Sequence, residues 1–310
     1  MTTSDYGSLD PEIAAAWLSS LDVSFGTKRD YDLAFRTFCK FIDSCAYDFD
    51  TLDEQNVLDF KSYLLNERRL SPSATSLYLS GVRSFYRFAE SRGLENIARN
   101  VHGSKRPRHF LKNNLSVEQA RALIRSFGVP TTQQDSRDLA IVSLMLHTGI
   151  RDVEITRAYI GDMTTMSGYD VLRVRGKGRD DADDFVKLSP ALFGQIREYL
   201  AIRGVVSRPE LPLFASVSRR NKGGMLTTRS ISRIVKNSLR RIGIDDPHYT
   251  AHSLRHSAIT FALLAGADLE DAQAMARHAD ISTTMIYSHH VNRLANAAED
   301  KISSLLDSAE

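Results

Sequence analysis

The 310-residue sequence contains only two cysteines, Cys39 and Cys45, separated by six positions. Two neighbouring cysteines cannot supply the disulfide framework of a secreted domain, so we expect a reducing compartment and a cytoplasmic protein. A long apolar run is also missing, because the most apolar stretch, residues 139–146, is far too short to span a bilayer. The first residues carry no basic segment followed by an apolar run, so we expect neither a signal peptide nor a membrane partner.

Acidic residues are absent from two stretches, although the chain contains 38 of them and its net charge is only +2. Residues 99–112 include five Lys or Arg, and residues 211–244 include eight. A run of charge is often a solvated face, yet long acid-free stretches favour a surface that binds nucleic-acid phosphates. The predicted DNA contacts are Lys105, Arg106, Arg108, Arg219, Arg220, Lys222, Arg229, Arg233, Lys236 and Arg240.

The first ninety residues predict a small helical domain. Apolar periodicity and start signals indicate helices over residues 11–21, 27–44, 53–69 and 71–92. In the second of these, Tyr31, Phe35 and Phe38 form an aromatic stripe that we interpret as core. We therefore expect a four-helix domain over residues 1–98, a basic linker over 99–114 and a second domain over 115–310. With 15 acidic and 11 basic residues in positions 1–100, DNA binding by the first domain requires its charges to be segregated.

The second domain is predicted to be rich in helices with a small antiparallel sheet. Ser116 and Gln119 have the spacing of a capping box for a helix that runs through residue 124. A helix over 136–148 is apolar on most sides and ends at Gly149, which makes it the expected buried centre. Two strands, over 169–175 and 185–188, are joined by a glycine-rich hairpin that carries Lys177. The fold class is therefore mainly α.

Residues that suit a phosphodiester gather between positions 252 and 287. His252, Arg255 and His256 have the spacing of one helical face, His278 follows a short helix over 269–276, and Tyr287 lies in a third helical run. Arginine binds phosphate oxygens with two parallel donors, histidine moves protons near neutral pH, and tyrosine can act as a nucleophile. This combination indicates phosphoryl-transfer chemistry.

Taken singly, each of these residues is more often packing or solvated surface than catalytic. The spacing of His252 and His256 also occurs in zinc sites. However, no Glu follows His252, so the H-E-x-x-H motif is absent and we expect no metal.

The ordered motifs TGIRDVE (148–154), RGKGR (175–179), HSLRH (252–256), RH (277–278) and ISTTMIY (281–287) resemble those of the tyrosine recombinase (phage integrase) family. The resemblance is closest to Xer-type and conjugative-element members and covers essentially the whole chain. It implies a SAM-like core-binding domain before a catalytic domain. It also implies a supporting acid at Glu154 and catalytic roles for Arg151, Lys177, His252, Arg255, His278 and Tyr287.

The resemblance further implies site-specific DNA recombination through a 3′-phosphotyrosyl intermediate, without a cofactor. The expected partner is double-stranded DNA with paired half-sites, bound by a homotetramer on two sites and by a monomer or weak dimer when free. Type IB topoisomerases share the chemistry, but the compact bundle and Xer-like motifs argue against that class. A non-catalytic DNA-binding regulator is the other alternative, and the intact residue set argues against it.

The sequence departs from the family pattern in two places, one before His278 and one after Lys177. Arg277 occupies the position before His278 where the family usually has Gly, and acids at 180, 181, 183 and 184 follow the Lys177 hairpin where a basic cluster is common. Four acids beside a hairpin that contacts DNA would repel phosphate. An amphipathic helix is also expected over 291–306, which packs either on its own domain or on a neighbouring protomer. The choice between chromosome dimer resolution, phage integration and mobile-element transfer stays open.

Overall fold

The computed structural model describes residues 6–7, 9–104, 114–176 and 182–278, together with 280–281, 284–285, 300, 302–303 and 306. The chain divides into two compact units, Met1–His109 and Phe110–Glu310. Within the described residues, no helix combines the length and the apolar character needed to cross a membrane.

The N-terminal unit is a helical bundle whose helices begin at side-chain caps. Ser24 accepts a hydrogen bond from the Thr27 amide, and Ser71 accepts one from the Ala74 amide directly before Pro72. The expected helices are present with slightly different bounds. They are α1 (Pro11–Ser20), α2 (Phe25–Ser44), α3 (Glu54–Ser62) and α4 (Pro72–Glu90), with a 3₁₀ turn η2 (Phe49–Thr51) between α2 and α3.

Aromatic side chains form the centre of this bundle, as the stripe on α2 predicted. Phe35 of α2 stacks on Phe85 of α4 with ring centroids 3.9 Å apart, and Trp17 of α1 meets both rings edge-on. Phe38 packs edge-on against Phe60 of α3. These contacts bring all four helices to one core.

One element of this unit differs from the expectation. The helix predicted over 53–69 changes from α to π geometry after Ser62, and the π-helical segment η3 spans Tyr63–Glu67. The amide of Arg68 bonds to the carbonyl of Tyr63, which is the i→i+5 pattern of a π-helix. The apolar periodicity of the sequence does not distinguish this local widening from an α-helix.

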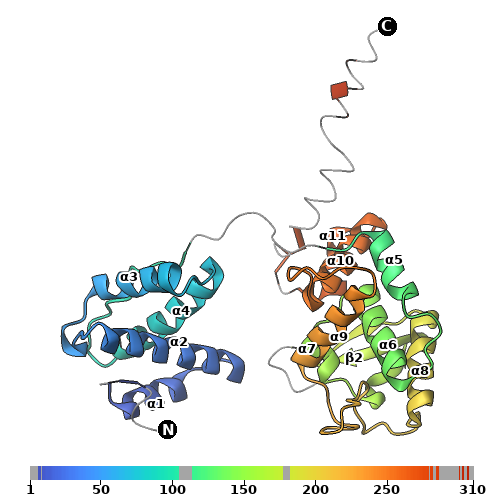
Figure 1. Ribbon diagram of the computed structural model, residues 1–310, viewed down its shortest axis with the longest axis horizontal. Coiled ribbons are helices and arrows are strands. Elements are labelled where there is room, and N and C mark those ends of the chain that lie inside the picture. The colour runs from blue at the N-terminus through green and yellow to red at the C-terminus, as the bar shows by residue number, and fades with distance from the viewer. Residues whose placement is uncertain are drawn as a thin grey trace. The chain divides into compact units, whose positions relative to one another are not determined.

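The C-terminal unit places a small sheet beside a set of helices (Figure 1). Its helices are α5 (Val117–Arg125), α6 (Gln133–Thr148), α7 (Asp152–Thr156), α8 (Pro190–Arg203), α9 (Thr228–Arg240), α10 (Ala251–Leu264) and α11 (Leu269–Ala276). The predicted capping box is present, because Ser116 and Gln119 each bind the other's backbone amide.

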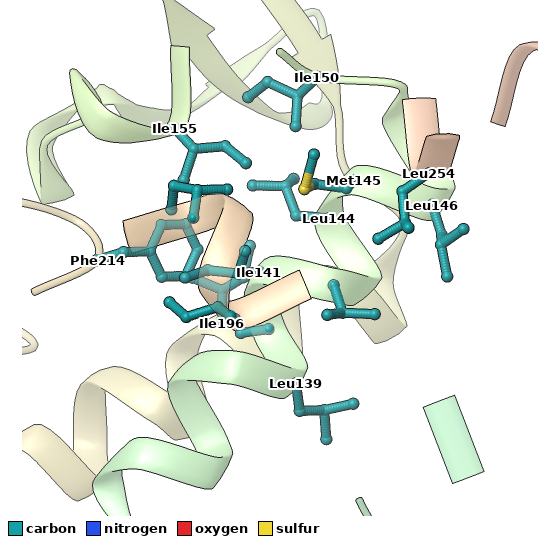
Figure 2. Packing of buried hydrophobic residues seen from close by; sticks show 14 of the residues in the cluster. Leu139, Ile141, Leu144, Met145, Leu146, Ile150, Ile155, Ile196, Phe214 and Leu254 are labelled. Atoms are coloured by element: carbon teal, nitrogen blue, oxygen red, sulfur yellow. The ribbon is translucent and has the colours of Figure 1, made fainter. Parts of the chain in front are cut away.

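Helix α6 is the buried centre of this unit, as predicted. Figure 2 shows Ile141, Leu144 and Met145 of α6 surrounded by apolar side chains from other elements, among them the ring of Phe214. Ile196 comes from α8, and Leu254 comes from α10. Because α6 is packed by several elements, the residues that follow its C-terminal end are held in fixed positions.

The sheet has three antiparallel strands in the order β1-β2-β3. The two predicted strands are β2 (Tyr169–Val174) and β3 (Asp184–Lys187), paired with Leu172 opposite Val186. A further strand, β1 (Met163–Met166), pairs with the other edge of β2 and was not predicted. A 3₁₀ turn, η4 (Ile160–Asp162), precedes β1, and its Asp162 pairs with Arg175, the residue after β2.

Candidate active site

Arg151 is positioned by the C-terminal end of α6. Gly149 ends the helix in the left-handed conformation, with a φ of 61°, and a residue without a Cβ atom adopts it at least cost. The chain then enters α7, with Arg151 at its N-cap. The guanidinium of Arg151 donates from Nη1 to Oε1 of Glu154 at 2.9 Å and from Nη2 to the carbonyl of Arg277 at 2.8 Å.

Arg255 of α10 joins the ends of two other helices. Its Nη1 donates to the carbonyl of Gly149 at the end of α6, and its Nη2 donates to the carbonyl of Ala276 at the end of α11. The residue is only 6% exposed. Because the last carbonyls of a helix lack partners within the helix, one guanidinium here satisfies both termini and is itself fixed in direction.

Glu154 is a buried carboxylate with three donors. Besides the Nη1 of Arg151, it accepts from the backbone amide of Arg151 at 2.8 Å and from Nη2 of Arg277 at 2.6 Å. Burial by itself raises the pKa of Glu154, but the charge and hydrogen bond of Arg277, together with those of Arg151, bring it below the ordinary value. Glu154 is therefore ionised at neutral pH.

His278 follows α11 and faces the same cluster. Its Nδ1 lies 2.9 Å from Oγ1 of Thr284. Burial, followed by the charges of Arg255, Arg151 and Arg277, lowers the pKa of His278 to about 4. At neutral pH the imidazole is therefore uncharged and acts through hydrogen bonding rather than through its charge.

The cluster of cations also affects Arg255. Burial, followed by the charges of Arg151 and Arg277, lowers the pKa of Arg255 to about 9, while Glu154 acts in the opposite direction. Arg255 stays protonated at neutral pH. Three guanidiniums around one carboxylate leave a net positive charge, which an anion such as phosphate would neutralise.

Of the remaining predicted residues, His252 is described by the structure, whereas several others are not. His252 is exposed in the first turn of α10, and Arg255 is buried one turn later on the same helix. Positions i and i+3 differ by only about 60° around a helix, so the two residues lie on one face but at different depths. Lys177 and Tyr287 lie outside the described residues, as do Lys105, Arg106 and Arg108.

The base of the Lys177 hairpin is nevertheless described. Arg175, at the end of β2, pairs with Asp162 of η4, with Nη2 3.0 Å from Oδ1. Arg157 reaches the carbonyl of Gly176 from Nη1 at 3.4 Å. The chain is therefore anchored directly before Lys177.

Helix α9 separates its charges from its apolar residues. Ile231, Val235 and Leu239 are buried, and the predicted contacts Arg229, Arg233 and Arg240 are exposed. Lys236, on the same helix, is half-buried. Arg240 forms an ion pair with Asp245, with Nε 2.9 Å from Oδ1. Before the helix, Arg219, Arg220 and Lys222 are also exposed. Arg240 is thus already neutralised, and Arg229 and Arg233 are the better candidates for phosphate contact.

Sequence reasoning missed the inward roles of Arg277, Thr284 and Asp184. Arg277 could have been singled out because it occupies a position where the family usually has Gly. Thr284 could have been singled out because it lies between His278 and Tyr287 in the sequence. Asp184, from the acidic stretch, has Oδ2 at 3.9 Å from Nε of Arg277. At least one of these acids is therefore directed toward an arginine of the site.

Comparison with known proteins identifies the family of the chain. The Phage integrase family matches residues 113–293, and its N-terminal SAM-like domain matches residues 17–93. The chain is 32% identical to the tyrosine recombinase XerC of Pelobacter propionicus, over 85% of this chain and 84% of the relative. It is 30% identical to XerD of Corynebacterium glutamicum, over 89% and 93%.

Solved structures show the same fold at lower identity. A XerH recombinase bound to palindromic difH substrate in a post-cleavage complex superposes with a TM-score of 0.72 at 19% identity, covering 96% of this chain and 92% of the other. A lambda integrase tetramer bound to a Holliday junction gives 0.68 at 12% identity, covering 89% and 75%. From its motifs, its fold and these matches, the chain belongs to the phage integrase family and is related to the Xer tyrosine recombinases.

Proposed function

We propose that the protein is a site-specific recombinase that cleaves and rejoins DNA strands through a 3′-phosphotyrosyl intermediate. One observation carries this proposal: Arg151 and Arg255 each donate to a backbone carbonyl of the same turn, formed by Ala276 and Arg277. Two guanidiniums fixed at one turn, beside the neutral imidazole of His278, form a site for the nonbridging oxygens of a phosphodiester.

In this proposal, Tyr287 attacks the scissile phosphorus. A bond forms between phosphorus and the phenolic oxygen, and the bond between phosphorus and the 5′ oxygen breaks. His252 assists removal of the phenolic proton, and Lys177 donates a proton to the departing 5′ oxygen. The phosphotyrosyl bond keeps the energy of the original ester, so a 5′ hydroxyl from another duplex reverses the step without ATP.

Arg151 and Arg255 act on the charge that develops in the transition state. Their guanidiniums already have fixed directions, so no reorganisation is needed when the nonbridging oxygens gain charge. His278 adds a hydrogen bond, and Glu154 orients Arg151 without contacting DNA. Removal of one such donor from a preorganised site typically lowers a rate by roughly 10²–10³-fold.

The proposed DNA surface combines the linker over 99–114 with the basic stretch over 211–244. Lys105, Arg106 and Arg108 belong to this linker, which connects the predicted domains 1–98 and 115–310 in the sequence, and they are proposed to contact phosphates. From the second domain, Arg219, Arg220, Lys222 and the exposed face of α9 contact the duplex. The proposed substrate is a pair of DNA sites, each with two half-sites, on which four copies of the chain assemble. Integration or excision of a mobile element and resolution of chromosome dimers in the cytoplasm are both compatible with this chemistry.

The test is covalent trapping on a nicked suicide substrate. The wild-type protein should become attached to DNA, and Tyr287→Phe should bind the same duplex without attachment. A control variant, Tyr169→Phe, changes an exposed tyrosine of β2 and should still become attached. Attachment of the Tyr287→Phe variant would show that another residue is the nucleophile.

A further inference from the structure

Arg277 adopts a backbone conformation that non-glycine residues rarely take. Its φ of 52° places it in the left-handed region, and it ends α11 by donating its amide to the carbonyl of Ala274. Such a position usually holds Gly, because a Cβ atom is unfavourable there. The backbone conformation therefore does not favour arginine at this position, and only the contacts of the side chain can favour it.

The side chain of Arg277 is directed into the protein and is only 6% exposed. Its Nη2 lies 2.6 Å from Oε2 of Glu154, and its Nη1 donates to the carbonyl of Met275 at 2.9 Å. On the other side, Nε is buried and makes no hydrogen bond with the described residues, while Asp184 Oδ2 lies 3.9 Å away. Arg277 thus links the acid of α7 to the first residue of β3.

Arg277 also reaches Arg151 by two separate routes. Its carbonyl accepts the hydrogen bond from Nη2 of Arg151, and its guanidinium binds the carboxylate that accepts from Nη1 of Arg151. The first contact depends only on the backbone, so a glycine would preserve it. The second depends on the side chain and is specific to an arginine here.

Three cationic side chains of the described residues lie around Glu154. Arg151 faces it from the start of α7, Arg277 from the end of α11 and Arg255 from α10. Asp184 of β3 lies beyond Arg277, and His278 is uncharged above a pH of about 4. Of the three cations, only Arg277 binds Oε2 through its side chain.

We propose that Arg277 is a positioning residue of the strand-cleavage reaction: it binds Oε2 of Glu154, leaves Oε1 to Arg151 and so fixes the guanidinium of Arg151 toward the scissile phosphate. This inference rests on the proposed recombinase function. The replacement of glycine by arginine at position 277 thereby gains a function. Because Arg151 and Arg277 share the single negative charge of Glu154, more of the positive charge of Arg151 remains available to the phosphate. The added charge compensates for the acid at position 184, which the family pattern does not contain.

The proposal predicts different effects for the backbone and the side chain. Arg277→Gly keeps the left-handed turn and the carbonyl bound by Arg151 but removes the cationic partner of Oε2, to which only the backbone amide of Arg151 then remains bound. Without that cation, burial raises the pKa of Glu154, so Glu154 becomes protonated at a higher pH. Arg277→Lys restores the charge without the planar fork and should recover part of the loss.

The experiment measures single-turnover cleavage of a suicide substrate by the full chain between pH 5 and 8. Arg277→Gly should cleave roughly tenfold to a hundredfold more slowly at neutral pH, as expected when a reacting group is displaced slightly. The acidic limb of its rate profile should move to higher pH. Adding Arg277→Gly to Glu154→Gln should cause a much smaller further loss, because the carboxylate that Arg277 binds has already been removed.

A second readout needs no DNA. The measurement is made in the His278→Gln background, because Arg277 also lowers the pKa of His278. There the difference in unfolding free energy between the proteins with and without Arg277→Gly should shrink as pH falls from 7 to 5, because a protonated Glu154 no longer requires the cation. Relief of the strained turn changes stability equally at every pH and does not mimic this slope. A pH-independent difference, or an equal rate loss in the Glu154→Gln background, would overturn the role of Arg277. Failure of the wild-type protein to attach to DNA would instead overturn the recombinase function, while the stability slope still decides the pairing.

Discussion

His278 is linked to Thr284, a side chain without exposed surface, through a 2.9 Å contact between its Nδ1 and the threonine Oγ1. Thr284 precedes Tyr287 by three positions. The contact fixes the imidazole ring about its own axis, and this leaves Nε2 as the ring atom available to a phosphate oxygen.

Thr284→Val should therefore slow cleavage without weakening DNA binding. The substitution keeps the shape of the side chain but removes the hydroxyl, and a hydrogen bond of this kind contributes about 1 kcal/mol, or roughly fivefold in rate. Single-turnover cleavage measures the effect. Thr284→Ser retains the hydroxyl and should cleave at close to the wild-type rate. If Thr284→Val cleaves as fast as wild type, the hydroxyl does not orient His278.

The lowered pKa of His278 predicts a pH dependence of stability. The unfolded chain binds a proton at this residue below about 6.5, whereas the folded chain binds it only below about 4. Between these values the unfolded state holds more protons, so stability falls as pH falls, by at most about 1.4 kcal/mol per pH unit from this residue.

Chemical denaturation of wild type and His278→Gln between pH 4 and 8 tests this. The variant should lose less stability than wild type as pH falls from 6.5 to 4. The two stability curves should run parallel above pH 7, where His278 is neutral in both states. Parallel curves over the whole range would contradict the lowered pKa.

Lys177→Ala tests the general acid. An alkoxide leaving from the 5′ carbon needs a proton, whereas a thiolate, with a thiol pKa near ~8.5, does not. The variant should cleave ordinary DNA roughly a hundredfold more slowly than wild type and should cleave DNA with a 5′ bridging sulfur at nearly the wild-type rate. Arg255→Ala should show no such recovery, because Arg255 binds nonbridging oxygens. Equal defects of Lys177→Ala on both substrates would leave only a positioning role for Lys177.

Charge reversal on α9 should change the salt dependence of DNA binding. The logarithm of the affinity should fall with the logarithm of the salt concentration by about 0.9 for each phosphate neutralised. Replacing Arg233 and Lys236 with Glu should flatten that slope. Arg208→Glu, an exposed arginine outside the basic stretch, is the matched control and should preserve it. An unchanged slope in the double variant would place the DNA surface elsewhere.

Most elements of the fold could be predicted because their signals are local. The cap at Ser71, the capping box of Ser116 with Gln119 and the left-handed glycine at 149 mark helix ends through the residues themselves. Strand β1 could not be predicted in the same way. Its four residues, Met-Thr-Thr-Met, do not alternate between apolar and polar, and they are extended because they pair with β2.

Four neighbouring residues of the candidate site were predictable from the sequence, but their contacts were not. Motif spacing identified Arg151, Glu154, Arg255 and His278, which the structure brings together at the ends of α6 and α11. Sequence spacing does not give the direction of a side chain at a left-handed position. For this reason the inward turn of Arg277 became evident only from its bond to Glu154.

The aromatic core of the N-terminal bundle has a spectroscopic consequence. Trp17 is the only tryptophan in the chain, and it is fully buried against Phe35 and Phe85. Its emission therefore reports unfolding of that bundle and carries no signal from the unit built around α6. Far-ultraviolet ellipticity records the helices of both units. Recorded together during one melt, the two signals separate the transition of each unit without any attached dye.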